Sequence, residues 1–363
     1  MVTNVGKVVS DAYGTDGMDE ADVDKAYQEA QNAINGGRLT SEYTLGVLNE
    51  NEAGNASGNA VLGKGGKQKS IVKVDIDGAT LKTDGNISAE AQEITNVNMT
   101  GVNAQVAAGT SAAGTVGILN VHRNSGVEIT SAMLDAADVD IKAIQSGLSK
   151  LNIYQGAGAV GGAIGAAYGS VNSEGKSGVG VGNSTITSDE DVDITANDES
   201  RTEVNAIGVS ISGGYSASVI VAEGTNKAET TVTVDKTNMN ADNDINIHAE
   251  RQAKDENGNT VDGKGNQYNS LSVSAIAASG GLMFAGTGVG ATANECGTVG
   301  AEVTGGSNFT AGNAINITAL NAPSVKAVTG AAAQVWWLQA QLLLQKQISA
   351  AKMRTNFLKL SLI

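Results

Sequence analysis

Apolar and polar residues alternate with a period of two in a hexapeptide that recurs along the chain. In the third copy Val192 and Ile194 point one way and the intervening Asp193 points the other, which predicts a half-buried strand. The copies are DGNISA at 84–89, DVDIKA at 138–143, DVDITA at 191–196, DINIHA at 244–249 and AINITA at 314–319. They lie 54, 53, 53 and 70 residues apart. We interpret the last interval as the same period lengthened by a polar, Gly- and Asn-rich loop at 253–269.

Between successive hexapeptides lie two further kinds of apolar segment. The first kind is rich in Gly and Ala and is found at 106–118, 158–171, 208–221 and 280–293. We predict strands here rather than helices, because each interior Gly would cost a helix about 1 kcal/mol. The second kind alternates and leads into the next hexapeptide, as in SIVKVDIDGATLKTD at 70–84 and TTVTVDKTNMNAD at 230–242. Each period is therefore expected to consist of strands and turns.

Strands repeated at a fixed period without a helical crossover predict an all-β protein, specifically a parallel β-helix or β-solenoid of ~53-residue repeats over residues 60–333. Since a coil of such a solenoid commonly takes about twenty residues, we expect two or three coils per period, stacked into a rod. An array of small β-sandwich modules is the alternative. Such modules need a recurring Trp or Cys pair as core anchor, and residues 1–333 contain no Trp.

Composition and charge agree with stacked coils and limit the partners. Aromatic residues make up 3% of the chain and Gly is present 47 times, as expected where small side chains pack between neighbouring coils. The formal net charge of −15 argues against nucleic acid and against anionic lipid, because both bind basic surfaces. The lone Cys296 excludes an internal disulfide and is expected to be a buried or half-buried thiol.

Residues 1–59 are interpreted as a remnant of the repeat that carries one inserted helix. Segment 16–37 has apolar residues at helical spacing, acidic residues in its first turn and Gly36 and Gly37 at its end. Such an amphipathic helix suits a surface excursion packed on the coils, with a receptor-facing knob as the alternative. No secretory signal sequence opens the chain, so we expect either a protein that stays inside the cell or an internal piece of a larger protein.

The tail 334–363 differs from the repeats, since it contains both tryptophans, four basic residues and no Gly, Asp or Glu. Its glutamines and lysines interrupt any apolar run long enough to span a membrane, so membrane insertion is not expected. Back-translated into the neighbouring frame, its start can spell GLVAAGT, which matches GLMFAGT at 281–287. We hypothesise a frameshift near residue 333, which an intact frame in several isolates would disprove.

The succession of a Gly/Ala-rich strand, an alternating strand such as AETTVTV at 228–234 and then DVDITA resembles the leukotoxin-type filamentous adhesins and filamentous-haemagglutinin-like exoproteins of Gram-negative bacteria. The resemblance covers about residues 60–333 and lies in repeat style, because degenerate strand repeats of this composition recur in many large surface proteins. It implies a fragment of an exported passenger, extracellular or at the bacterial surface, that attaches to or damages host cells. No functional residue is carried over by it.

Part of the insertion imitates a calcium loop, through Asp255, Asn257, Asn259 and Asp262. The match fails at the sixth position, where Thr260 replaces the required Gly, and at the twelfth, where Asn266 replaces Glu. A polar loop is therefore the expected structure, with weak calcium binding as the alternative. We expect no metal and no cofactor.

Catalytic groups are hard to find. The two histidines, His122 and His248, lie in different repeats, and we expect His248 to be an exposed strand residue. Three acids recur once per period, Asp138, Asp191 and Asp244, as a repeated turn or strand edge predicts. A β-helix polysaccharide lyase or hydrolase, the alternative function, would need clustered carboxylates instead. We therefore predict no catalytic, cofactor or metal residue and no enzyme.

The function expected from the sequence is passive display by a stiff acidic rod. Binding would be spread over its exposed face or concentrated in the excursions at 16–37 and 253–269. The expected partners are an unidentified host-cell surface protein or glycan and other segments of the same solenoid.

Overall fold

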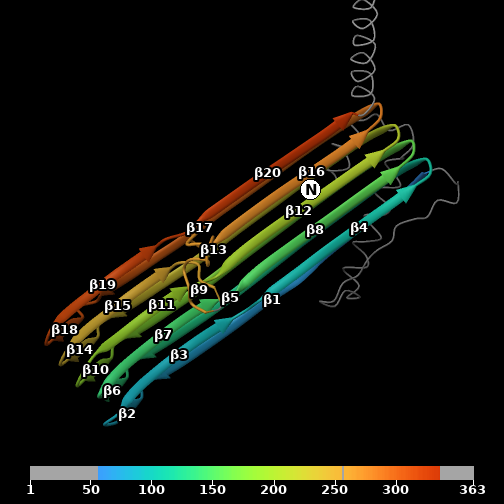
Figure 1. Cartoon of the computed structure of the whole chain (residues 1–363). Helices are drawn as coiled ribbons and strands as arrows, with labels where there is room; N and C mark the ends of the chain where they lie inside the picture. The colour runs from blue at the N-terminus through green and yellow to red at the C-terminus, as the bar shows by residue number, and fades with distance from the viewer. Residues whose placement is uncertain (1–55, 256, 336–363) are drawn as a thin grey trace, which may run out of the picture.

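The computed structural model describes residues 56–255 and 257–335 (Figure 1). The predicted helix at 16–37 and the tail beyond Val335 lie outside the described residues. Within the described part every regular element is a strand, which confirms the all-β prediction. The first strand begins at Ala56, close to the predicted start of the repeats at residue 60, and the last one includes Gln334 and Val335.

Four strands form each coil, and five coils follow one another along the described chain. Coil 1 consists of β1 (Ala56–Asp77), β2 (Thr80–Lys82), β3 (Asn86–Ile94) and β4 (Val97–Ala107). Coil 2 consists of β5 (Thr110–Thr130), β6 (Met133–Ala136), β7 (Asp138–Ser146) and β8 (Leu148–Ala159). Coil 3 consists of β9 (Gly162–Gly182), β10 (Thr185–Ser188), β11 (Val192–Asp198) and β12 (Arg201–Ser212). Coil 4 consists of β13 (Tyr215–Asp235), β14 (Asn238–Ala241), β15 (Asp244–Arg251) and β16 (Leu271–Gly281). Coil 5 consists of β17 (Phe284–Thr304), β18 (Asn308–Ala311), β19 (Ala314–Asn321) and β20 (Val325–Val335).

Equivalent strands of successive coils pair in parallel and build four five-stranded sheets (Figure 1). Sheet A joins β1, β5, β9, β13 and β17, and sheet B joins the short strands β2, β6, β10, β14 and β18. Sheet C joins β3, β7, β11, β15 and β19, and sheet D joins β4, β8, β12, β16 and β20. The chain crosses the molecule along sheet A, turns back through sheet B and returns through sheets C and D. This arrangement is a β-solenoid, as the sequence predicts.

One period forms one coil, so the expectation of two or three coils per period is wrong. The reason is the length of the sheet A strands: β5, β9, β13 and β17 each have 21 residues and use up most of one side of the coil. A strand of that length spans ~70 Å, whereas five stacked coils rise only ~20 Å. The described part is therefore a flat slab rather than a rod.

The register of sheet C confirms four of the five hexapeptides as equivalent segments. Ile194 lies opposite Ile141 and Ile247, and Ile247 lies opposite Ile317. The first copy is displaced: Ile87 pairs with Val139, so NISAEA at 86–91, two residues later than predicted, is the equivalent segment. A shift of two residues leaves the same side chains facing inward, so the alternation alone does not reveal it.

The interior contains two large apolar clusters and a small one formed by Ala113, Ala157 and Ala163. One large cluster lies between sheets A, B and C and includes Leu134, Ile141, Ile194 and Ile245, all fully buried. The other large cluster lies between sheets A and D and includes Leu151, Ile153, Ile220 and Leu271. Small and β-branched residues are enough because each coil is also covered by the coils above and below it.

The Gly/Ala-rich stretches are strands, as predicted, and each contains the turn from sheet D into the next sheet A strand. At this turn the coils lie so close that a side chain does not fit. A Cβ atom on Gly214 would clash with the carbonyl oxygen of Gly161, and one on Gly161 would clash with that of Gly109. Glycine is therefore required here by close backbone approach.

Candidate functional site

Residues 252–270 form the one large excursion from the coils in the described part, and we call them the insertion loop. Arg251 pairs with Asp198 and Leu271 pairs with Thr202, so nineteen residues in coil 4 replace the three residues 199–201 of coil 3. The loop leaves the molecule between β15 and β16, halfway along the face formed by sheets C and D. Its position confirms the predicted loop at 253–269.

Two turns of the same design shape the insertion loop, one closed by contacts between Asp255 and Asn259 and one by contacts between Asp262 and Asn266. In the first, Oδ1 of Asp255 accepts hydrogen bonds from the backbone N–H groups of Asn257 and Asn259, at 2.9 and 2.8 Å. The Asn259 side chain donates to Oδ2 at 3.0 Å. Gly258 has φ of +78° and closes the turn. Such a conformation favours Gly.

The second turn repeats these contacts. Oδ1 of Asp262 accepts from the N–H groups of Lys264 and Asn266, at 2.8 and 2.9 Å, and Gly265 has φ of +81°. Hydrogen bonds from Asn259 and Asn266 hold the pKa values of Asp255 and Asp262, respectively, below the ordinary range. The Asp255 and Asp262 carboxylates therefore hold the backbone of the two turns in place. The described residues contain no group of three potential metal-ligating side chains.

We expect the insertion loop to lose its shape in acid. Carboxylates with depressed pKa values stabilise the folded turn fully above the unfolded pKa of about 3.9, and this contribution disappears as pH falls through the lower folded pKa. The protection of the Asn259 and Asn266 amides, measured as the exchange rate relative to the intrinsic rate of an unprotected amide at the same pH, should therefore be high at neutral pH and fall below about pH 4. In Asp255→Asn/Asp262→Asn the exchange should be fast throughout, whereas Asp189→Asn, at an exposed corner, should match the parent. Slow exchange in the double variant would contradict the role of these carboxylates.

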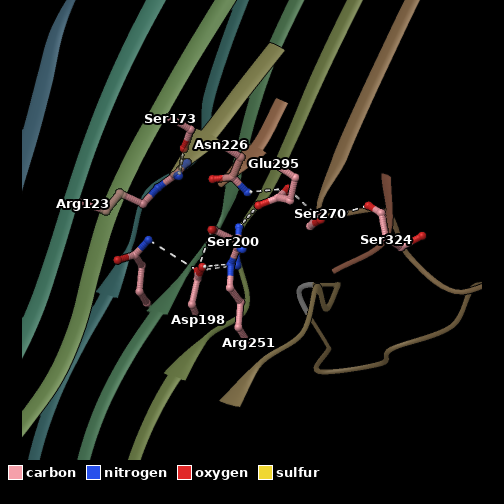
Figure 2. Close-up of polar contacts among 10 residues, drawn as sticks. Arg123, Ser173, Asp198, Ser200, Asn226, Arg251, Ser270, Glu295 and Ser324 are labelled. Carbon is pink, nitrogen blue, oxygen red and sulfur yellow. Dashed lines mark hydrogen bonds and ion pairs between the residues drawn. The ribbon is translucent and has the colours of Figure 1, made fainter. Parts of the chain in front are cut away.

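A line of buried polar side chains runs through all five coils beneath the insertion loop and separates the two large apolar clusters. We call it the seam, and Figure 2 shows its part in coils 2 to 5. It contains one charged residue per coil, and the sign alternates. In coil order these residues are Glu93, Arg123, Asp198, Arg251 and Glu295. Alternation places Asp198 between the bases of the two neighbouring coils, and Glu93 and Glu295 each next to one base, which offsets the cost of removing these charges from water.

Arg251 is the centre of the best-connected part of the seam (Figure 2). Its Nε lies 3.2 Å from Oδ2 of Asp198 in the coil before, and its Nη2 is hydrogen-bonded to Glu295 in the coil after. The exposed fractions of the Arg251, Asp198 and Glu295 side chains are 2%, 2% and 8%. Gly297 provides the space, since a Cβ atom there would overlap the Arg251 guanidinium.

Arg123 spans three coils by hydrogen bonds to neutral groups. Its guanidinium donates to the carbonyl of Thr95 at 3.1 Å, to the hydroxyl of Ser149 at 2.6 Å and to the hydroxyl of Ser173 at 3.1 Å. Burial lowers the pKa of Arg123, and the nearby charges of Glu93 and Asp198 act in the opposite direction. The two arginines thus tie consecutive coils together along the inside.

The insertion loop is attached to the seam at both ends. It begins directly after Arg251, and at its far end the Ser270 hydroxyl oxygen lies 3.0 Å from the Glu295 carboxylate and 2.9 Å from the carbonyl of Ser324, and its single proton is donated to one of them (Figure 2). On its outer side the Arg201 guanidinium of coil 3 lies 4.7 Å from the centre of the Tyr268 ring, in cation–π contact. The loop is therefore held on a rigid base.

The histidines lie apart, in different sheets. His122 lies in β5 of sheet A and contacts Glu174, with Nδ1 3.1 Å from Oε2. His248 lies in β15 of sheet C, where its side chain is 32% exposed and contacts Thr318 and Glu250. The outward, partly exposed position of His248 agrees with the prediction of a strand residue.

The recurring acids lie at the corner between sheets B and C. Asp191 accepts hydrogen bonds from the backbone N–H of Asp244 at 2.9 Å and from the Asn243 side chain at 2.8 Å, both in the next coil. Asp244 repeats the arrangement with Ala314 of coil 5, at 2.8 Å. Burial and the neighbouring acids raise the pKa of Asp138. Asp191 and Asp244 thus have the predicted role at a repeated strand edge.

Cys296 corrects one expectation, because its thiol is exposed rather than buried. It follows the inward-facing Glu295 in β17, so the alternation of the strand turns it outward. The seam is the feature that the sequence reading missed. A signal was present: continuing the two-residue alternation beyond Ala196 and Ala249 turns Asp198 and Arg251 inward.

The chain matches no protein-family model, no curated protein and no solved structure. The described residues contain no helix that is long and apolar enough to cross a membrane. Evidence on function therefore comes from the molecule itself, and its two distinctive parts are the insertion loop and the seam.

Proposed function

We propose that this chain is a structural and binding segment of a large secreted or surface-exposed bacterial protein, an adhesin or leukotoxin-like filament that attaches to host cells. The observation that carries the proposal is the insertion loop. It breaks an otherwise regular repeat, and it is folded by its own side-chain contacts and fixed at both ends to a buried network. Exposed loops held by a rigid scaffold are where binding residues concentrate.

The edge of coil 5 supports the second part of the proposal, that other segments of the same solenoid are partners. Ile315 and Ile317 are both 45% exposed, whereas Ile245 and Ile247, at the same positions one coil earlier, are fully buried. In the described residues, strands β17 to β20 pair on one side only. A further coil would cover these apolar side chains and pair with the open strands.

The test of the binding role is to replace residues 252–270 of the full chain by the sequence of residues 199–201, the corner that coil 3 uses. Labelled protein should bind a panel of host cells and immobilised surface glycans, and the corner replacement should reduce binding at least tenfold. The free energies of unfolding of the two proteins should agree within about 2 kcal/mol, since shortening the exposed loop from nineteen residues to three changes its closure entropy by only about 1.6 kcal/mol.

A matched control is Lys176→Ala/Glu229→Ala, which alters an exposed ion pair on sheet A, away from the insertion loop. It should bind like the parent chain. If the corner replacement folds normally and also binds like the parent, the insertion loop is not the binding site. If the parent binds no host cell or glycan, the proposed attachment function fails.

A further inference from the structure

The strands of sheet D reverse their inside and outside preferences towards their C-terminal ends. In β12, Val204 points into the apolar core, as the alternation requires. Further along the strand Val209 and Ile211 point outward, with exposed fractions of 39% and 49%. Ser210, between these two, is completely buried. Here the apolar side chains face solvent and the polar one faces the interior.

The same reversal recurs from coil to coil. In coil 1, Val102 and Val106 are 53% and 83% exposed, while Gln105 between them is buried. In coil 2, Tyr154 is 41% exposed and its neighbour Gln155 is buried; in coil 4, Ile276 is 41% exposed and Ser279 is buried. Register places Val102, Tyr154, Ile207 and Ile276 side by side across sheet D. We call the outward-facing positions at 102–106, 154–158, 207–211 and 276–280 the outer strip.

The outer strip stabilises the coils that carry it less than a covered face would. Its large apolar side chains other than Ile207 remain 39–83% exposed, and that exposed area contributes nothing to folding, while the buried polar side chains beneath them are unfavourable. Within the described residues, the Ser210 and Ser279 hydroxyls and the Gln155 amide have no hydrogen-bond partner. An arrangement that weakens the isolated slab and yet recurs in four coils indicates that a partner covers the outer face.

Charge and shape indicate which partner fits. The outer strip carries no charged residue on a chain of net charge −15, so the partner's matching surface must be apolar. Coil 3 forms a ridge, while coil 4 forms a trough beside it: Val209 pairs with Ala278 and Ile211 with Gly280. The ridge of one molecule therefore fits the trough of another, and a two-fold axis makes both contacts at once.

The size of the outer strip agrees with this partner. Three outward positions along each strand span ~17 Å and the four stacked coils of the outer strip span ~19 Å, so two facing copies bury ~650 Å² in total. This area is below the ~1,000 Å² of a typical stable interface and corresponds to a weak, transient dimer. We propose that a second copy of this chain packs face to face on the outer strip. The proposal does not depend on the host-cell function, and it concerns a different surface from the insertion loop.

Sedimentation velocity on the full chain tests the proposal, over roughly 1 to 200 µM because a small interface gives a micromolar dimer. We expect a monomer–dimer equilibrium, and Ile211→Asp should weaken it at least tenfold by burying a carboxylate in the apolar contact. Thr195→Asp, which alters the outward face of sheet C, should leave it unchanged. Circular dichroism should show that both variants remain folded.

Three results would overturn the proposal. The first is a parent chain that stays monomeric over the whole concentration range. The second is a dimer that Ile211→Asp, confirmed as folded, leaves unaffected. The third is open-ended assembly, which would indicate stacking at the coil 5 edge instead of face-to-face packing.

Discussion

Replacing Arg251 by Met should lower the free energy of unfolding by about 3–5 kcal/mol, because the substitution leaves two buried carboxylates without their cation. Asp198 and Glu295 both contact the Arg251 guanidinium and are almost completely inaccessible to water. Chemical denaturation followed by circular dichroism measures the effect. The control is Lys176→Met, whose ion pair with Glu229 is about half exposed on both sides and should contribute 0–1 kcal/mol.

A second variant separates charge from packing at the same place. Arg251→Met combined with Asp198→Asn and Glu295→Gln removes all three charges but keeps oxygen acceptors for Ser200 and Ser270, and we expect it to recover most of the lost stability. If Arg251→Met alone is as stable as the parent chain, the seam charges are not buried as described. If the triple variant is no better than the single one, the loss comes from packing rather than from unpaired charge.

The second large effect is expected at Ile194, which is fully buried in the middle coil. Ile194→Ala should cost about 2–5 kcal/mol, through the lost transfer free energy of the side chain and the cavity left between coils. The matched control is Ile317→Ala, at the equivalent position in coil 5, where the side chain is 45% exposed and the cost should be about 1 kcal/mol. Equal costs would show that coil 5 is as fully covered as coil 3. Denaturation by urea, with the m-value compared between variants, checks both.

The inward and outward sides of the strands were predictable from the sequence. Val192 and Ile194 alternate with Asp193, and a strand buried on one side requires that pattern. The displaced first repeat shows the limit of this reading. Pairing Ile87 with Val139 rather than with Ile141 keeps every side chain on its side, so only the whole sheet decides between the two registers.

The width of the coil could not be read from the sequence, because alternation looks the same in a short coil and in a long one. The width of the coil is fixed by the positions of the turns at which the chain changes direction, and few residues mark these turns. The turn from sheet A to sheet B uses a positive φ at Gly78, Ser131, Asn183 and Lys236, at equivalent positions in four coils. Gly and Asn are usual there, but Ser and Lys are not, so the periodic turn is hidden in two coils.

The sequence predicted one part of the candidate site, the insertion loop, but not the seam. The composition of 253–269 indicated a polar loop, but the twin turns depend on hydrogen bonds from Asn259 and Asn266 that only the folded loop defines. The charges of the seam come from both faces of the slab, with Arg123 on sheet A and Asp198 on sheet C. No local spacing relates such residues, which meet only because the coil is flattened.

Because one period forms one coil, each repeat adds only one strand spacing to the height of the stack. A coil of about 53 residues advances the stack by only ~4.8 Å, so even a thousand residues of this design would reach ~90 Å. Most residues of each repeat therefore lie along the width of the slab, and few contribute to its height. A long stack of this kind would form a wide panel that carries many loops side by side, rather than a thin stalk with one distant tip.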